Sequence, residues 1–268
     1  MISRSPTLNV MMAAARKAAR GLVRDFGEVE HLQVSMKGPS DFVSSADLKA
    51  EKVLRQELEK SRPGYGFLLE EGGEIVGDDR SHRWIIDPID GTTNFLHGIP
   101  HFAISIALER DGEIVAGIVY QPVNDEMFHA EKGGGAFLNE RRLRVSARRR
   151  IEEAVFATGL PFKGRPNHER SLKEVATVMA TCAGIRRFGS AALDMAYVAA
   201  GRYEGYWESG IHAWDIAAGV ILVREAGGYV TDIDGGTTML TGGEVLAAND
   251  HMHAPLRTMI NAARRGKD

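Results

Sequence analysis

The stretch from Trp84 to Phe95 constrains this chain more than any other. It reads Trp-Ile-Ile-Asp-Pro-Ile-Asp-Gly-Thr-Thr-Asn-Phe. The first three residues are apolar and predict a short buried strand, and the acids Asp87 and Asp90 follow where that strand is expected to end. Pro88 lies between them. Because proline has no amide hydrogen and a fixed φ, it is expected to stop strand pairing and to stiffen the turn that holds both acids.

The residues after these acids are typical of an anion-binding turn. Gly91 lets the backbone approach a ligand closely, and Thr92 suits the first turn of a helix, whose free amides bind oxyanions such as phosphate. Two carboxylates about 4 Å apart would repel by roughly 4 kcal/mol at an effective dielectric of 20. A divalent cation between Asp87 and Asp90 would remove that conflict. In the alternative interpretation, the two acids only cap backbone amides in a structural turn.

The overall composition limits the classes of protein to consider. The chain has 268 residues and a formal net charge of −3, so it can bury a large core, and nothing global points to nucleic acid or an anionic membrane as a partner. The single cysteine, Cys182, excludes an internal disulfide and fits a reducing compartment, which predicts a cytoplasmic protein. No apolar run is long enough to cross a bilayer.

The first patterned segments predict helices separated by a polar connection. Residues 1–24 carry an amphipathic pattern that we interpret as a docked first helix, a pattern that a mitochondrial presequence would share. Residues 31–45 are polar and turn-rich, and Asp47 is expected to be the N-cap of the helix that follows.

The rest of the chain predicts an antiparallel meander followed by alternating strands and helices, and hence a mixed α and β fold. The expected strands are 67–69, 84–86, 102–108, 114–120, 126–130, 136–138, 155–158, 185–188, 203–207, 229–231 and 245–248. The expected later helices are 168–181, an alanine-rich helix capped by Gly189-Ser190 that runs to Gly201, 214–226, and one that begins at about 250.

The segment 141–150 is strongly basic, with six arginines. We interpret it as a solvated connection, because no aromatic residues are interleaved with the arginines as they would be in a nucleic-acid site. The other interpretation makes it a surface for a protein partner.

Several motifs in the same order along the chain resemble those of the inositol monophosphatase family, whose members are Mg-dependent, lithium-sensitive phosphomonoesterases. The stretch 84–95 resembles the family signature. The other matching segments are Lys37 with Asp41 and Asp47, Glu70-Glu71, Thr158 to Phe162, Gly189 to Ala192, Glu208 to His212 and Trp214 to Gly219.

The resemblance implies the fold and the organisation of the chain. It implies an α+β protein, a layered α-β-α-β-α sandwich of the inositol monophosphatase and fructose-1,6-bisphosphatase type, usually assembled as a homodimer. The chain would form one domain over 1–268, with a metal-binding α+β half at 1–145 and a substrate-reading α/β half at 146–268.

The resemblance also implies a site for two or three Mg²⁺ ions. The ligands would be the carboxylates of Glu70, Asp87, Asp90 and Asp215 and the backbone carbonyl of Ile89. These are hard oxygen donors, which suit Mg²⁺ and argue against zinc. Taken alone, the first of these acids would be interpreted as part of a solvated strand edge and the last as a partner of a helix dipole.

The catalytic residues implied by the resemblance surround the same turn. Glu70 and Thr92 would position the attacking water, and Asp47 would accept a hydrogen bond from the Thr92 hydroxyl. The amides of Gly91 and Thr92 would bind phosphate oxygens.

The resemblance places the alcohol half of the substrate against three further groups: Asp90, the backbone of Ala191, and Glu208. A carboxylate accepts hydrogen bonds from polyol hydroxyls well, so Glu208 is a reasonable residue to bind the alcohol. In the alternative interpretation, Glu208 is only a solvated residue at a strand end. His212 is interpreted as a packed imidazole without a catalytic part.

The function implied is hydrolysis of a small phosphate monoester, namely inositol-1-phosphate and related sugar or polyol phosphates. The alternative substrates on the same scaffold are histidinol phosphate, fructose 1,6-bisphosphate and 3′-phosphoadenosine nucleotides. A different class of function remains open as well, because some bacterial proteins that resemble this chain associate with the transcription machinery, and segment 141–150 would be the surface for it. Neither a membrane nor direct nucleic-acid binding is expected.

Overall fold

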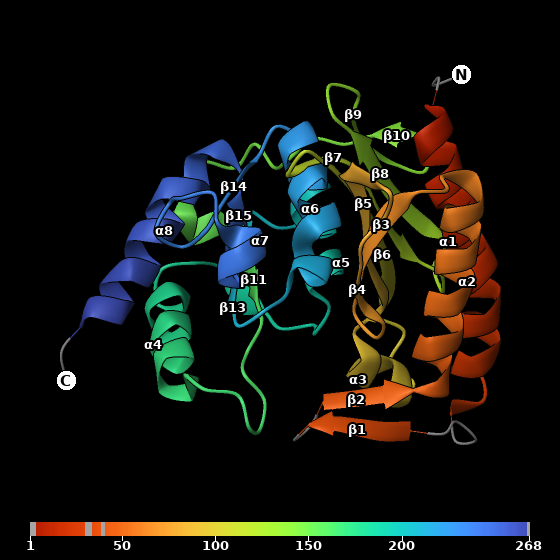
Figure 1. The fold of residues 1–268 in the computed structure, drawn as a ribbon. Coiled ribbons are helices and arrows are strands. Elements are labelled where there is room, and N and C mark those ends of the chain that lie inside the picture. Colours follow the sequence, from red (N-terminus) through yellow and green to blue (C-terminus); the bar gives the residue numbers. More distant parts are fainter. Residues whose placement is uncertain (1–3, 30–33, 39–40, 267–268) are drawn as a thin grey trace.

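The computed structural model describes residues 4–29, 34–38 and 41–266, and the side chains of 36–43 lie outside that description. Figure 1 shows five stacked layers in the order helices, sheet, helices, sheet, helices. The expected α-β-α-β-α sandwich is therefore confirmed. Three groups of buried apolar side chains fill the spaces between the layers. Among the described residues, no helix has both the length and the apolar character needed to span a membrane.

The first outer layer consists of α1 (Pro6–Phe26) and α2 (Ser45–Ser61). The amphipathic pattern near the N-terminus does form a docked helix, because the apolar stripe of α1 is buried against α2 and the first sheet. Where a polar, turn-rich connection was expected, the backbone forms a hairpin of β1 (Val34–Gly38) and β2 (Asp41–Ser44). The expected roles of the Lys37 and Asp41 side chains fall outside the described residues.

The predicted N-cap of α2 is wrong by three residues. Ser44 is the N-cap, and Asp47 lies in the first turn, where its carboxylate accepts hydrogen bonds from the Ser44 amide at 2.8 Å and the Ser44 hydroxyl at 2.6 Å. This is a capping box, in which an acid three residues into the helix reaches back to the cap. Strand β2 ends at Ser44, and α2 begins at the next residue.

The first sheet has eight strands in the order β10-β9-β8-β7-β6-β5-β3-β4. Their bounds are β3 (Tyr65–Leu69), β4 (Gly73–Ile75), β5 (Asp79–Asp90), β6 (Ala103–Arg110), β7 (Glu113–Gln121), β8 (Glu126–Glu131), β9 (Gly135–Leu138) and β10 (Arg141–Arg142). The strands from β6 to β9 form the antiparallel meander that the sequence predicted, and β5 joins it antiparallel to β6. The first two residues of segment 141–150 were expected in a solvated connection but pair with β9 as strand β10. Strand β3 runs parallel to β5. Two acid-bearing segments, the end of β3 and the end of β5, therefore meet at the same edge.

Strand β5 does not stop before Pro88, contrary to expectation. Asp87 lies opposite Ser105 and Asp90 opposite Ala103. Strand β5 therefore advances by three residues where β6 advances by two. One extra residue is accommodated as a bulge, which is how a strand tolerates a residue without an amide hydrogen. The Ile89 amide donates to Asp87 Oδ1 at 2.9 Å, within the bulge, and no longer follows the regular ladder.

The middle layer consists of α5 (Ala191–Ala199) and α6 (Ala213–Glu225), which are buried on almost every side. A helix that is apolar all round must lie between other layers. The close packing depends on two glycines: a Cβ on Gly117 of β7 would lie 2.7 Å from Ile221, and one on Gly219 would lie 2.6 Å from Met195. This packing directs the N-terminal ends of both helices toward the edge of the first sheet where its acids lie.

The second sheet has the order β12-β11-β13-β15-β14, and α4 (His168–Met179) and α8 (Asp250–Arg265) cover its far side. Its strands are β11 (Val155–Thr158), β12 (Gly184–Arg186), β13 (Gly205–Ser209), β14 (Tyr229–Thr231) and β15 (Glu244–Ala248). The remaining short helices are α3 (Thr92–Leu96), α7 (Met239–Gly242) and the 3-10 turn Ile151–Glu153. Strand β13 runs two residues beyond its predicted end, so Glu208 belongs to the strand, opposite Val245.

Candidate active site

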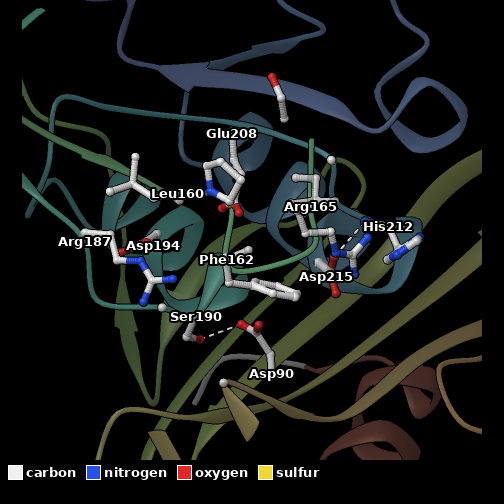
Figure 2. Close-up of a pocket in the computed structure, with 18 of the residues that line it drawn as sticks. Asp90, Leu160, Phe162, Arg165, Arg187, Ser190, Asp194, Glu208, His212 and Asp215 are labelled. Carbon is white, nitrogen blue, oxygen red and sulfur yellow. Dashed lines mark hydrogen bonds between the residues drawn. The ribbon is translucent and has the colours of Figure 1, made fainter. Parts of the chain in front are cut away.

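Three carboxylates converge where β5 meets α6. Asp87 and Asp90 come from the bulged end of β5 and are 2% and 8% exposed, and Asp215 comes from the first turn of α6. One oxygen from each lies within 4.8 Å of the others. The Asp215 carboxylate also accepts a hydrogen bond from the His212 amide at 2.7 Å, which fixes it at the helix start. Figure 2 shows Asp90 and Asp215 facing the pocket from separate elements.

The electrostatics of this cluster are unfavourable for three charged groups. Burial, followed by the nearby Glu70, Asp90 and Asp215 carboxylates, raises the pKa of Asp87 well above its usual value. Burial and the Asp90 charge raise the pKa of Asp215 in the same way. Burial also raises the pKa of Asp90, to about 7, although hydrogen bonds from Ser190 and the Ala192 amide oppose that shift. Such a set of acids is stable as carboxylates only beside added positive charge.

Glu70 joins the cluster from the neighbouring strand. It follows the last residue of β3, and its amide donates to the carbonyl of Ile86 on β5 at 3.2 Å, which holds the two strand ends together. Its side chain hydrogen-bonds with Asp87 and raises the pKa of that acid. The solvated strand edge considered for Glu70 is therefore not what the fold produces, since the side chain faces the other acids.

Thr92 connects the cluster to the first layer of helices. Its hydroxyl contacts two acceptors, the Ile89 carbonyl at 3.0 Å and Asp47 Oδ1 at 3.3 Å. The contact between Thr92 and Asp47 expected from the sequence is present. Asp47 is fully buried, and burial raises its pKa, with the hydrogen bonds from Ser44 opposing the shift.

Gly91 forms the turn between β5 and α3 and brings the two halves of the chain together. Its φ is +98°, and a Cβ there would lie 3.1 Å from the carbonyl oxygen of His101 and 3.2 Å from that of Gly189. Only glycine fits this position without strain. Asn94 reinforces the contact, because its side-chain amide donates to the carbonyls of His101 at 2.8 Å and Phe188 at 2.7 Å.

A cavity of about 630 Å³ lies over these groups. The acids and the start of α3 form its base, while the 159–167 loop, Arg187 and the N-terminal end of α5 form its walls. Glu208 enters it from β13 and accepts a hydrogen bond from the Tyr206 hydroxyl. Gly159 makes room for that carboxylate, since a Cβ there would lie 1.9 Å from it. Burial raises the pKa of Glu208, against the opposing effects of Tyr206 and Arg187.

A buried acid cluster under a pocket of this kind has a known counterpart. The model of the inositol monophosphatase family matches residues 3–266. The chain belongs to the inositol monophosphatase family. Among curated relatives of this family member, an inositol-1-monophosphatase of Rhizobium meliloti is 60% identical over 97% of both chains. A protein named Nus factor SuhB of Escherichia coli K12 is 44% identical over 91% of both chains.

A solved structure supports the same assignment. The extragenic suppressor protein suhB of Bartonella henselae superimposes on this inositol monophosphatase family member with a TM-score of 0.94 and 57% sequence identity, covering 98% of this chain and 100% of the other. The resemblance of the motifs and the expected fold type are thus confirmed.

The fold brings together every site residue that the sequence predicted. Seven line the cavity: Glu70, Asp90, Gly91, Thr92, Ala191, Glu208 and Asp215. Three lie directly behind it and hold or neighbour the lining groups: Asp47, Asp87 and Ile89. Their chemical roles remain predictions.

Four charged residues of the cavity wall were missed by the sequence reasoning: Arg165, Arg170, Arg187 and Asp194. Asp194 lies on α5, and Arg187 lies just before the Gly189-Ser190 cap of that helix. An isolated acid in an alanine-rich, buried helix was a usable signal for Asp194. No local sequence signal indicated Arg187, because it belongs to an irregular segment whose path depends on the rest of the fold.

Proposed function

We propose that this chain is a Mg²⁺-dependent phosphatase that hydrolyses inositol-1-phosphate, and related sugar or polyol phosphates, to the free alcohol and inorganic phosphate. The observation that carries the proposal is the convergence of Asp87, Asp90 and Asp215 within 4.8 Å under a cavity, in a chain 60% identical to a protein named inositol-1-monophosphatase. The buried carboxylates are hard oxygen donors and lack charge balance without a cation, so the donor set fits Mg²⁺.

Two or three Mg²⁺ ions would be held by the carboxylates of Glu70, Asp87, Asp90 and Asp215 and the Ile89 carbonyl. Bound there, the metal supplies positive charge that offsets the phosphate and lowers the pKa of a water molecule. The Ile89 carbonyl accepts from the Thr92 hydroxyl and keeps a second lone pair for a ligand.

The residues around this centre would orient the reacting groups. The single proton of the Thr92 hydroxyl is shared between the Ile89 carbonyl and Asp47 Oδ1, which leaves the lone pairs of the Thr92 oxygen free to accept from a water molecule. Thr92 and Glu70 would then hold the attacking water in line with the phosphorus. The amides of Gly91 and Thr92, at the start of α3, would bind phosphate oxygens as charge develops on them.

The alcohol would lie against the second half of the chain. The Ala191 backbone at the start of α5, Asp90, and the carboxylate of Glu208 face the cavity. The two carboxylates accept hydrogen bonds and the first amides of α5 donate them, so together they suit a molecule with several hydroxyls. The division into a metal-binding half at 1–145 and a substrate-reading half at 146–268 is part of this proposal. The boundary between the two sheets, which falls between β10 and β11, supports it.

The substrate class is tested by phosphate release from a panel of phosphate esters. The proposal predicts a higher kcat/KM for inositol-1-phosphate than for histidinol phosphate, fructose 1,6-bisphosphate or a 3′-phosphoadenosine nucleotide. If kcat/KM were several orders of magnitude higher for one of the other esters, the proposed alcohol would be wrong but the proposed reaction type would stand. Asp87→Asn serves as the control, and we expect it to lower kcat/KM at least about 100-fold, since even groups behind metal ligands cost 10- to 100-fold when lost. Equal phosphate release in Mg²⁺ and in EDTA would contradict the proposal.

A second function has a specific observation in its favour. Relatives 43–44% identical to this chain are named Nus factor SuhB, so we propose contact with the transcription machinery as an additional role. The arginines of 141–150 would be the surface. All six arginines of this segment are exposed, and we choose Arg144 and Arg149 for change to Ala. Arg148 is left in place because it pairs with the buried Glu204, so its loss would damage the fold. Retention of transcription proteins by the Arg144→Ala, Arg149→Ala variant at the wild-type level would argue against that surface.

Three further properties belong to the proposal. We infer a homodimer, a cytoplasmic location and inhibition by lithium, all on the basis of family membership. Sedimentation of the purified protein tests the first, fractionation of cells the second, and phosphate release at increasing Li⁺ the third. A monomer, a secreted protein or an unaffected rate, respectively, would contradict them.

A further inference from the structure

Asp194 is a buried acid that the proposed chemistry leaves unused. It lies on α5, one turn after the N-cap Ser190, and is 1% exposed. It lines the cavity, and its Oδ1 is fully enclosed without a hydrogen-bond partner. Figure 2 shows Asp194 and Arg187 on one side of the pocket and Asp215 and His212 on the other. Asp194 is therefore separate from the three-carboxylate cluster.

The surroundings of Asp194 disfavour its charged form in the substrate-free protein. Burial raises its pKa well above the usual value, and the nearby carboxylates of Glu208 and Asp90 raise it further. The positive charge of Arg187 lowers the pKa of Asp194 and so opposes these effects. The Arg187 guanidinium lies beside Gly189, because a Cβ built on that glycine would lie 3.0 Å from one of its nitrogens. A buried acceptor without a donor costs free energy that the fold must supply elsewhere.

Two other buried acids outside the carboxylate cluster, Asp47 and Glu174, differ from Asp194 because their neighbours donate hydrogen bonds to them. Asp47 accepts from the backbone and hydroxyl of Ser44. Glu174 accepts from the Trp207 indole at 3.1 Å and Arg264 at 2.7 Å. An acid kept in place without such partners, at the wall of a ligand cavity, is the pattern expected of a group whose donor arrives with the ligand.

We propose that Asp194 is a specificity-determining residue that accepts a hydrogen bond from a hydroxyl of the substrate's alcohol. With Glu208 it offers two acceptors in one cavity, so the alcohol carries at least two hydroxyls besides the esterified oxygen. This inference rests on the proposed phosphatase function and deepens it. It predicts that hydroxyl groups on the ring, and not the phosphate alone, determine which esters are hydrolysed rapidly.

The test is a cycle of two substrates and three proteins. Inositol-1-phosphate is compared with cyclohexyl phosphate, which has the same ring without hydroxyls, under saturating Mg²⁺. The proteins are the wild type, Asp194→Asn, and the control Asp25→Asn. The control makes the same chemical change at a buried acid of α1: Asp25 pairs with Arg24 and Lys49 and does not line the cavity.

We expect Asp194→Asn to lower kcat/KM for inositol-1-phosphate by about 10-fold or more, because a charged carboxylate acceptor is replaced by an uncharged amide whose hydrogen bond is weaker. For cyclohexyl phosphate the change should be less than about threefold, because that substrate has no hydroxyl to donate to the altered side chain. Asp25→Asn should change the two substrates alike. Thermal unfolding adds a second readout: Asp194→Asn should unfold at the wild-type temperature or higher, and Asp25→Asn lower, since only the control loses ion pairs.

Each other outcome overturns the inference. An equal fall in kcat/KM for both substrates would assign Asp194 a general structural or electrostatic role. An unchanged kcat/KM for inositol-1-phosphate would show that Asp194 does not contact the alcohol. A wild type that hydrolyses both esters equally would remove the hydroxyl specificity while leaving the phosphatase function intact. A wild type that hydrolyses neither would refute the proposed function itself.

Discussion

The acid cluster predicts an unusual response to the loss of Asp87. Two unit charges 4.8 Å apart repel by about 3.5 kcal/mol at an effective dielectric of 20, and Asp87 has two such neighbours, Asp90 and Asp215. Proton uptake relieves part of this in the metal-free protein, because the pKa values of these acids are raised. We therefore expect Asp87→Asn to increase the free energy of unfolding by about 2 kcal/mol in EDTA, or about 5 °C in a domain of this size.

The same substitution should remove the response to metal. Wild-type protein is expected to unfold at a higher temperature as Mg²⁺ is added, because a ligand that binds only the folded state stabilises it. Asp87→Asn should show little of that rise. Differential scanning calorimetry in EDTA and in Mg²⁺ measures both effects. A variant that unfolds below the wild type in EDTA and keeps the full Mg²⁺ response would refute the reasoning.

The remaining predictions concern pH, the alcohol pocket and the second sheet. The folded-state pKa of Asp90 is about 7 against a usual value of 3.8, so its contribution to stability is present below about pH 4 and is lost as the pH rises to about 7 in EDTA. Urea unfolding across that range should show the decline, and Asp90→Asn should flatten it. A steeper decline in the variant would be contrary to this account. Gly159→Ala places a methyl group 1.9 Å from the Glu208 carboxylate and should raise KM for inositol-1-phosphate about tenfold or more, with Mg²⁺ binding by calorimetry unchanged. Unchanged KM would mean that Glu208 does not touch the alcohol. Glu174→Ala removes the acceptor of the buried Trp207 indole and one of the two carboxylate partners of Arg264, which keeps Glu244, and should cost about 2 kcal/mol in urea unfolding. A loss below about 1 kcal/mol would show that the contacts of Glu174 contribute no more than a surface ion pair.

Local sequence signals predicted much of the fold because they act over a few residues. Ser190 before an alanine-rich run is an N-cap, and its hydroxyl does accept from the Leu193 amide at 3.3 Å. The acids of 84–95 follow an apolar strand, so their convergence with Glu70 follows from two neighbouring strand ends. The family resemblance then supplied the long-range partner, Asp215, which no local pattern connects to β5.

The features that were missed depend on contacts distant in sequence. Pro88 was expected to end β5, but the pairing of Asp87 with Ser105 and of Asp90 with Ala103 continues the strand through a bulge. Likewise, an isolated acid in an alanine-rich helix was a usable signal for Asp194, but its missing hydrogen-bond partner is seen only once α5 is packed against the cavity.

The account depends on a divalent cation held by the acids at the end of β5. Crystals grown with Mn²⁺ in place of Mg²⁺ and measured at the manganese absorption edge would locate the ion directly. The account predicts an anomalous peak at about 2.1 Å from oxygens of Asp87, Asp90 and Asp215, the distance typical of hard cations of this size. An empty cluster at millimolar Mn²⁺, or a peak that none of these three carboxylates touches, would contradict it.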